Sequence, residues 1–178
     1  MAANGARWQG ACLTIGVFTG TPGHLKSFDY VGLHRYSLTF CTHQRAQMFV
    51  EPSRVEIVLK QILRAAADEG FEIIAYCFIP DHLHLLIEAR TDASNALGFI
   101  SRAKQLSAYY YKRTFGQVLW QRYGFERVLR NDEQTLVVAR YILENPLRRG
   151  MAARIEDYPF VGSTLYTVSE ILEAIQLS

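Results

Sequence analysis

The stretch that decides the fold is FEIIAYCFIPDHLHLLIE, residues 71–88. Phe71–Ile79 is apolar at positions on both faces of a strand, which is typical of a strand at the centre of a sheet. Pro80 and Asp81 predict a turn, and His82–Glu88 predicts a second strand directly after it. A connection this short joins strands that run antiparallel. The segment therefore predicts an antiparallel strand pair whose first strand is buried.

Further elements are expected on either side, and proline, glycine and capping residues mark the ends of the longer helices. They are a strand at Arg35–Thr42, a helix from Pro52 to Gly70, a helix from Asp92 to near Gly116, an extended segment at 120–129, a helix from Asn131 to about Glu144, and a short helix at Val168–Ile175. The order β-α-β-β-α-β-α predicts an α+β fold. A small antiparallel sheet with helices packed on one face satisfies that order.

Length and composition predict one globular domain without a membrane span. The 178 residues are 49% hydrophobic, which suffices for one core and not for two comfortable domains. No apolar run reaches the ~18 residues that a membrane span needs, and residues 1–10 lack the basic region of a secretory signal. We expect a cytoplasmic protein with a flexible leader at 1–30, a domain at 31–164 and a tail helix at 165–178.

The basic residues are concentrated in the middle of the chain. Residues 93–154 contain 11 basic and 4 acidic side chains, whereas residues 155–178 contain 4 acidic and no basic ones. Fifteen of the 19 basic residues are arginine, whose guanidinium group matches phosphate geometry. Such a block is compatible with a solvated helix surface and equally with a polyanionic partner.

Two histidines stand in the second predicted strand. Side chains on a strand repeat every two residues, so His82 and His84 leave the same face and Leu83 leaves the other. Two neighbouring imidazoles on one face form half of a divalent-metal site. The alternative is a pair of ordinary surface or core histidines. The flanking segments are strongly apolar, so a polar pair within them favours a functional role.

A tyrosine and an asparagine mark the end of the helix predicted before Pro146. Tyr141 and Asn145 are four residues apart, a spacing that places them on one helix face. A tyrosine hydroxyl acts as a nucleophile when it is aimed at an activated centre, and an asparagine oxygen is a neutral metal ligand. The alternative is a core tyrosine followed by an Asn-Pro helix end.

Four segments together carry a resemblance to a known family. The segment AYCFIPDHLHLL, residues 75–86, resembles the M-P-N-H-V-H-L-L block of the HUH single-tyrosine transposases of the IS200-like superfamily, especially the REP-associated tyrosine transposases. Three later blocks of that family are matched in order by LWQRY at 119–123, by YILENP and RGM within 141–151, and by DYPF at 157–160.

The resemblance implies a ferredoxin-like or RRM-like fold and a specific chemistry. It implies that His82 and His84 bind Mg²⁺ or Mn²⁺, that Asn145 is the third protein ligand, and that Tyr141 is the nucleophile. Tyr141 would attack a phosphate of single-stranded DNA and hold the new 5′ end as a phosphotyrosine. Relatives recognise hairpins of palindromic DNA, so single-stranded or hairpin DNA is the expected partner.

Two residues depart from the family pattern. Asp81 stands where an asparagine is usual before the first histidine, and either adds to metal binding or caps the turn; the turn is favoured. Arg127 lies where many relatives carry a histidine, which leaves any supporting role of that position open.

The expected DNA contacts are basic residues that follow phosphates and aromatic residues that stack on unpaired bases. They are Arg102, Lys104, Tyr109, Lys112, Arg113, Trp120, Arg122, Arg127 and Arg140.

Two other functions stay open at this point. One is a nucleic-acid-binding module without catalysis, and the other is a metal-dependent phosphodiesterase that uses water as the nucleophile. We expect a monomer or a homodimer, in which the tyrosine serves its own subunit or a partner.

Overall fold

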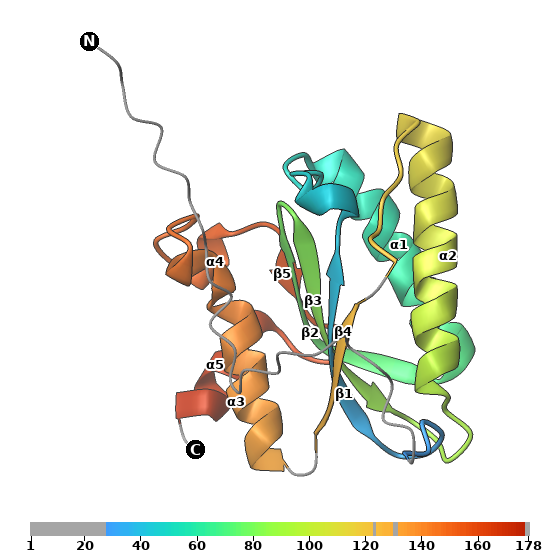
Figure 1. The fold of residues 1–178 in the computed structure, drawn as a ribbon. Coiled ribbons are helices and arrows are strands. Elements are labelled where there is room, and N and C mark those ends of the chain that lie inside the picture. Colours follow the sequence, from blue (N-terminus) through green and yellow to red (C-terminus); the bar gives the residue numbers. More distant parts are fainter. Residues whose placement is uncertain (1–27, 123, 130–131, 177–178) are drawn as a thin grey trace.

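A five-stranded antiparallel sheet forms the centre of the protein in a computed structural model that describes residues 28–122, 124–129 and 132–176 (Figure 1). Its strands are β1 Arg35–Cys41, β2 Phe71–Ile79, β3 His82–Ala89, β4 Phe125–Leu129 and β5 Val161–Gly162, in the order β4-β1-β3-β2-β5. The helices are α1 Pro52–Glu69, α2 Ala96–Phe115, α3 Asp132–Leu143, α4 Asn145–Arg148 and α5 Val168–Gln176. Two 3₁₀ turns, η1 His43–Arg45 and η2 Ile155–Asp157, follow β1 and α4 in the chain.

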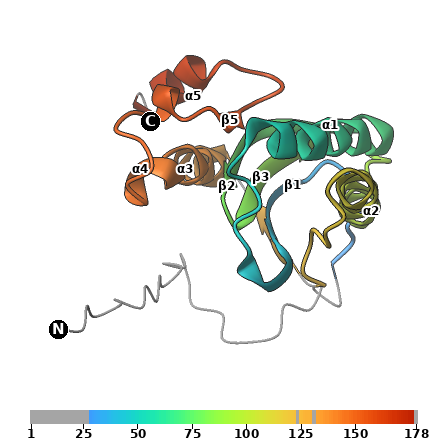
Figure 2. The same ribbon diagram turned by 90° about the horizontal axis from the view of Figure 1, so that it is seen from above.

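The predicted α+β class with an antiparallel sheet is confirmed, and the helices cover both faces of the sheet. Helices α1 and α2 pack on one face, whereas α3 and α5 lie on the other (Figure 2). The element order had predicted helices on one face only. The difference follows from the double-sided apolar character of β2 and β3, because both sides of such strands have to be removed from water.

Alternation along β3 assigns its residues to the two faces. Leu83, Leu85 and Ile87 belong to the apolar cluster beneath α1 and α2, and Leu86 belongs to the cluster beneath α3 and α5. The odd-even pattern therefore places His82 and His84 on the α3 side.

The first helix begins and ends as predicted. Pro52 occupies its first position, and Gly70 ends it in the left-handed region at φ 73°, where its N–H bonds the carbonyl of Ala66.

The second helix starts later than predicted. Asn95, not Asp92, caps α2, because the Asn95 side chain accepts a hydrogen bond from the N–H of Gly98 at 3.0 Å. Asp92 lies in the preceding turn, which is closed by the bond from the Ser94 N–H to the Thr91 carbonyl.

The predicted leader overlaps the folded core at its end. Most of residues 1–30 lie outside the described part of the chain, as does the predicted cap Asn131. Tyr30 is only 6% exposed, and its carbonyl accepts a hydrogen bond from the N–H of Ala96. Within the described ranges, no helix combines the length and apolarity required to cross a bilayer.

Candidate active site

The imidazoles of His82 and His84 face each other on the α3 side of the sheet. Their Nε2 atoms are 3.0 Å apart, and the ring planes meet at 89°. The side chains are nearly closed off from solvent, at 3% and 6% exposed. The placement on one face agrees with the prediction from strand alternation.

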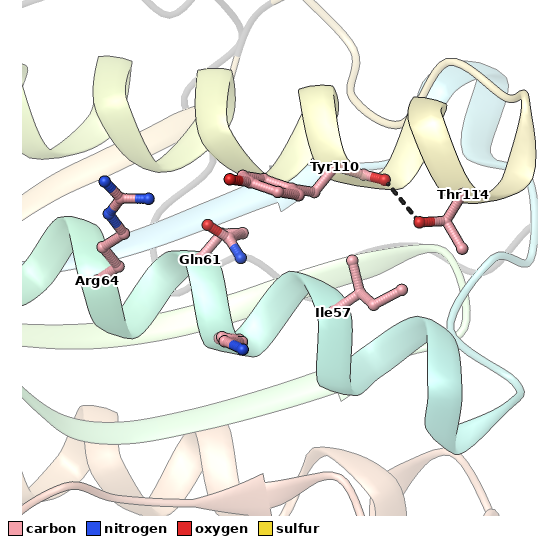
Figure 3. A pocket seen from close by; sticks show the side chains of 6 residues that line it. Ile57, Gln61, Arg64, Tyr110 and Thr114 are labelled. Carbon is pink, nitrogen blue, oxygen red and sulfur yellow. Dashed lines mark hydrogen bonds between the residues drawn. The ribbon is translucent and has the colours of Figure 1, made fainter.

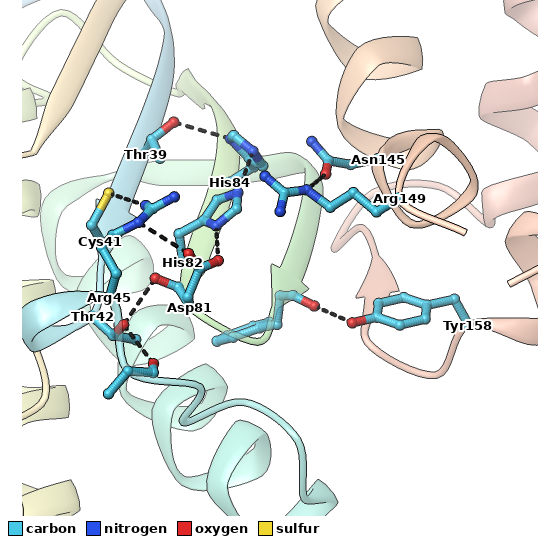
Figure 4. Close-up of polar contacts among 12 residues, drawn as sticks. Thr39, Cys41, Thr42, Arg45, Asp81, His82, His84, Asn145, Arg149 and Tyr158 are labelled. Carbon is cyan, nitrogen blue, oxygen red and sulfur yellow. Dashed lines mark hydrogen bonds and ion pairs between the residues drawn. The ribbon is translucent and has the colours of Figure 1, made fainter. Parts of the chain in front are cut away.

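Each imidazole is oriented through its other ring nitrogen (Figure 4). The Nδ1 of His82 lies 2.6 Å from Oδ1 of Asp81, and the Nδ1 of His84 lies 3.0 Å from Oγ1 of Thr39, its neighbour across the β1–β3 pair. Oδ2 of Asp81 in turn pairs with Nε of Arg45 at 3.0 Å. The Asp81 carboxylate thus binds His82 and Arg45 and does not cap the turn as favoured from sequence.

Helix α3 brings Tyr141 beside the histidine pair. The ring centroids of Tyr141 and His84 are 5.9 Å apart, with the planes at 80°. The guanidinium carbon of Arg148 lies 4.3 Å from the Tyr141 ring centroid, and Arg148 also donates a hydrogen bond to the Tyr141 carbonyl. The Tyr141 ring on α3 and the histidines on β3 therefore belong to the same chain, and the fold brings these two elements together.

Asn145 lies on a separate helix, not on the continuous helix that the four-residue spacing predicted. Helix α3 ends at Leu143, and α4 begins at Asn145 with Pro146 in its first turn, a position where proline is tolerated. Asn145 is 4% exposed, and its Oδ1 accepts a hydrogen bond from Nε of Arg149 at 3.1 Å. Figure 4 shows the Arg149 guanidinium group directed toward His84.

The surroundings keep both imidazoles neutral. Burial, chiefly, lowers the pKa of His84 well below its usual value, and the charges of His82, Arg149, Arg148 and Arg45 add to the effect. Burial also lowers the pKa of His82, although the hydrogen bond to Asp81 acts in the opposite direction. A neutral imidazole is the form that binds a metal ion.

The two Nε2 atoms lie within hydrogen-bond distance of each other, and the same separation suits two ligands of one divalent cation. Two ligands at about 2.1 Å from an ion and at right angles to each other are about 3.0 Å apart, which is the separation of the two Nε2 atoms. In the described part of the chain, no group of three or more His, Cys, Asp or Glu side chains gathers around one point. Asn145 is a buried amide at the same site (Figure 4).

Comparison with known proteins identifies the family. The family described as "Transposase IS200 like" matches residues 30–145, which include His82, His84, Tyr141 and Asn145. The chain belongs to the IS200-like transposase family. This match agrees with the resemblance seen in the sequence blocks.

Relatives of this IS200-like transposase have been found in several bacteria. The REP-associated tyrosine transposase of Escherichia coli K12 is 23% identical over 118 residues, covering 66% of this chain and 68% of that protein. The ISDra2 transposase TnpA of Deinococcus radiodurans is 35% identical over 103 residues, covering 53% and 72%. A Haemophilus influenzae protein assigned as a REP-associated tyrosine transposase is 29% identical over 101 residues, covering 51% of this chain and 57% of that protein.

A solved structure of a REP-associated tyrosine transposase bound to a REP hairpin shares the fold. It has a TM-score of 0.64 at 20% identity, covering 75% of this chain and 79% of that one. At this identity the match supports the architecture alone.

The predicted DNA contacts on α2 lie on the face opposite to the histidines. Arg102 pairs with Asp68 of α1 at 2.7 Å, and Lys104 donates to the carbonyl of Gln121 at 2.8 Å, so both hold the fold together. Tyr109 is 59% exposed, and Lys112 and Arg113 are exposed in the last turn of α2. These three remain available to a ligand, but the sheet separates them from Tyr141 of this IS200-like transposase.

Trp120 is part of the core and cannot stack on a base in this conformation. It is 8% exposed, and its indole ring lies 5.6 Å from Phe40 and 5.7 Å from Phe49, centroid to centroid. Its Nε1 donates to Oγ of the fully buried Ser107 at 2.8 Å. Trp120 is therefore a core residue in this structure, and its prediction as a DNA contact is not supported.

The remaining predicted arginines have different surroundings. Arg127 projects from β4 opposite Ser37, on the same face as Thr39 and the histidines. Arg140 is exposed and pairs with Glu144 at 2.8 Å. Arg122 is exposed near the start of β4.

An open pocket between α1 and α2 adds further basic and aromatic side chains to the face opposite the histidines (Figure 3). Its lining consists of Ile57, Lys60, Gln61, Arg64, Tyr110 and Thr114. It is distant in the fold from the histidine pair, and it contains none of the predicted site residues.

Sequence reasoning missed four residues of the site. Arg148 and Arg149 follow Glu144 and Asn145 at four-residue spacing, so helical periodicity offered a signal for them. Thr39 and Arg45 offered none, because their contacts depend on the pairing of β1 with β3 and on the loop after β1.

Proposed function

We propose that this IS200-like transposase cuts single-stranded DNA with Tyr141 and holds the new 5′ end covalently as a phosphotyrosine. The observation that carries the proposal is the position of the Tyr141 ring, which lies against His84 within one chain. A nucleophile and a metal half-site that meet in this way can act on one phosphate.

Mg²⁺ or Mn²⁺ bound by His82 and His84 would withdraw charge from the scissile phosphate. Asn145 is proposed as the third protein ligand. A carbonyl oxygen has two lone pairs, so Oδ1 of Asn145 can keep its bond from Arg149 and still accept a second partner.

Tyr141 is the residue of the chain that reacts with the phosphate. The Tyr141 phenol loses its proton as its oxygen bonds to phosphorus, and the bond from phosphorus to the 3′ oxygen breaks. The 3′ oxygen takes up a proton and leaves as a hydroxyl. Because one phosphodiester replaces another, a second 3′-hydroxyl can reverse the step and join the strands.

Two arginines are suited to the charge of the phosphate. Arg148 contacts the Tyr141 ring, and the Arg149 side chain is directed toward His84. Guanidinium groups stabilise the charge that builds on phosphate oxygens in the transition state. We propose that both arginines orient the strand against Tyr141.

We further propose that the DNA is a hairpin of a palindromic sequence next to single-stranded DNA. A protein of the same fold was solved with a REP hairpin. The exposed Tyr109, Lys112 and Arg113 of α2 and the basic residue Arg127 of β4 are the side chains proposed for contacts with the DNA.

A covalent-adduct assay tests the proposal. The protein is incubated with Mn²⁺ and a labelled hairpin oligonucleotide that carries single-stranded flanks, and the products are separated on a denaturing protein gel. We expect a slower band with the label, absent in Tyr141→Phe and His84→Ala. Tyr166→Phe is the matched control, because Tyr166 is an exposed tyrosine near the C-terminus, and it should form the adduct normally.

The same gel separates the two alternatives. Free cleaved DNA without an adduct would indicate water as the nucleophile. Intact DNA without an adduct on this gel, together with a protein–hairpin complex on a native gel, would indicate a binding module. An adduct that persists in Tyr141→Phe would overturn the assignment of the nucleophile.

A further inference from the structure

The loop after β1 holds an arginine in an unusual backbone conformation next to the candidate site. Gln44 and Arg45 both have positive φ, at 53° and 57°, a region that residues with a side chain rarely occupy. Such conformations persist only where the surrounding structure enforces them.

Buried Thr42 connects this loop to the turn before the histidines. Its Oγ1 donates toward the carbonyls of Ala46 and Asp81, at 2.8 and 2.9 Å, and its N–H donates to the same Asp81 carbonyl at 3.0 Å. The N–H of Arg45 closes the loop on the Thr42 carbonyl at 3.0 Å. The backbones of the loop and of Asp81 are therefore fixed relative to each other.

The Arg45 side chain reaches from this loop to Asp81. Its Nε lies 3.0 Å from Oδ2 of Asp81, and its Nη1 lies 2.8 Å from Sγ of Cys41. The other carboxylate oxygen, Oδ1, lies 2.6 Å from Nδ1 of His82. Each oxygen of Asp81 thus has its own partner, one a guanidinium group and the other an imidazole.

We propose that Asp81, held by Arg45, is a positioning residue that fixes the tautomer of His82 and so directs its Nε2 lone pair toward the site. The inference rests on the proposed function, in which His82 binds a divalent ion. It concerns the one position where this chain has a carboxylate and the family pattern has an asparagine.

Aspartate and asparagine differ in how they hydrogen-bond to Nδ1 of His82. An ionised carboxylate only accepts hydrogen bonds, so Nδ1 of His82 has to carry the proton and Nε2 is left bare. An asparagine can turn either its oxygen or its NH₂ group toward Nδ1, and it therefore tolerates both tautomers. Carboxylates in this outer position also raise the basicity of a ligating imidazole.

The arrangement exceeds what turn stability requires. The turn is already anchored to the segment after β1 through backbone groups, since the Asp81 carbonyl accepts from Thr42 and the Pro80 carbonyl accepts from the N–H groups of Met48 and Phe49. The carboxylate makes none of these bonds. Its two contacts are with Arg45 of the strained loop and with His82, the candidate metal ligand.

The test compares Asp81→Asn with the wild-type chain by two measurements. Long-range ¹H–¹⁵N spectra of the metal-free protein at pH 7.5 report which ring nitrogen of His82 carries the proton. Calorimetric titration with Mn²⁺ alone reports affinity. Asp68→Asn is the matched control, because Asp68 is a carboxylate paired with Arg102 on the opposite face of the sheet.

We expect the Nδ1–H tautomer of His82 in the wild type and in Asp68→Asn, and a mixture in Asp81→Asn. The dissociation constant for Mn²⁺ should rise about 10- to 100-fold in Asp81→Asn and stay unchanged in Asp68→Asn. Arg45→Gln should weaken Mn²⁺ binding in the wild-type background and have no further effect when combined with Asp81→Asn.

A single, unchanged Nδ1–H tautomer in Asp81→Asn would overturn the inference, even if the adduct assay supported Tyr141 as the nucleophile. Conversely, a wild-type chain that failed to bind Mn²⁺ would contradict the proposed function, while the tautomer spectra would still decide the role of Asp81.

Discussion

Acid should destabilise the metal-free protein through His84. Burial in the folded chain lowers the pKa of His84 well below its ordinary value, whereas a histidine in the unfolded chain titrates near pH 6.5. Below that pH the unfolded chain binds a proton that the folded chain does not. The free energy of unfolding therefore falls as the pH falls.

The size of the effect follows from the difference in proton binding. If His84 stays neutral in the folded chain, lowering the pH from 7.5 to 5.5 reduces the free energy of unfolding by about 1.4 kcal/mol. His82 has its pKa lowered in the same direction and adds a further decrease. Asp81 does not contribute in this window, because its pKa is lowered and its stabilisation is lost only in more acid solution.

Urea unfolding at pH 7.5 and 5.5, in EDTA, measures this quantity. His84→Gln removes the titrating group and should reduce the pH-dependent loss by about 1.4 kcal/mol. If His84→Gln lost as much stability between the two pH values as the wild type, the assignment of a buried, neutral His84 would be wrong.

Three further predictions concern packing and binding. Gly70→Ala should lower the free energy of unfolding in urea by about 2 kcal/mol, because φ is 73° and a Cβ there would lie 2.8 Å from Oγ of Ser94. Gly116→Ala, at φ 71° with open space around it, should lower it by only about 1 kcal/mol, from the backbone conformation alone. Equal losses for the two variants would contradict the steric argument. Trp120→Phe should lower the free energy of unfolding by about 1–3 kcal/mol, because it removes the indole N–H that donates to a buried serine hydroxyl. A loss of hairpin affinity with unchanged stability would instead support Trp120 as a DNA contact. Mn²⁺ at about 100 times its dissociation constant should stabilise the protein by about 2.7 kcal/mol in thermal unfolding, and equal stabilisation of His84→Gln would place the ion elsewhere.

Local periodicity made much of the fold and half of the site predictable. The run of apolar residues in Phe71–Ile79 and the short Pro80-Asp81 turn predicted the central strand pair, which is observed with the same bounds for β2. Side-chain alternation predicted that His82 and His84 share a face, since that depends only on the two-residue repeat of a strand.

Other expectations failed where two signals competed locally. Asp92 and Asn95 are both suitable helix caps, and the residue that caps α2 is Asn95, which also forms a β-bridge with Val31. Pro146 is compatible with the end of one helix and with the first turn of the next. In the structure it lies in the first turn of α4. Such choices differ by energies that tertiary contacts easily exceed.

By itself, the sequence determined the direction in which each side chain leaves its element, because that direction follows from the repeat of a strand or helix. The tertiary structure alone decided which distant elements meet. Packing of α3 against the second apolar face of the sheet brings Tyr141 to His84, and the fold of the loop after β1 brings Arg45 to Asp81. Packing of α1 and α2 on the opposite face buries Trp120 among aromatic residues. These outcomes depend on removing apolar surface from water over the whole domain, a property that no short segment carries.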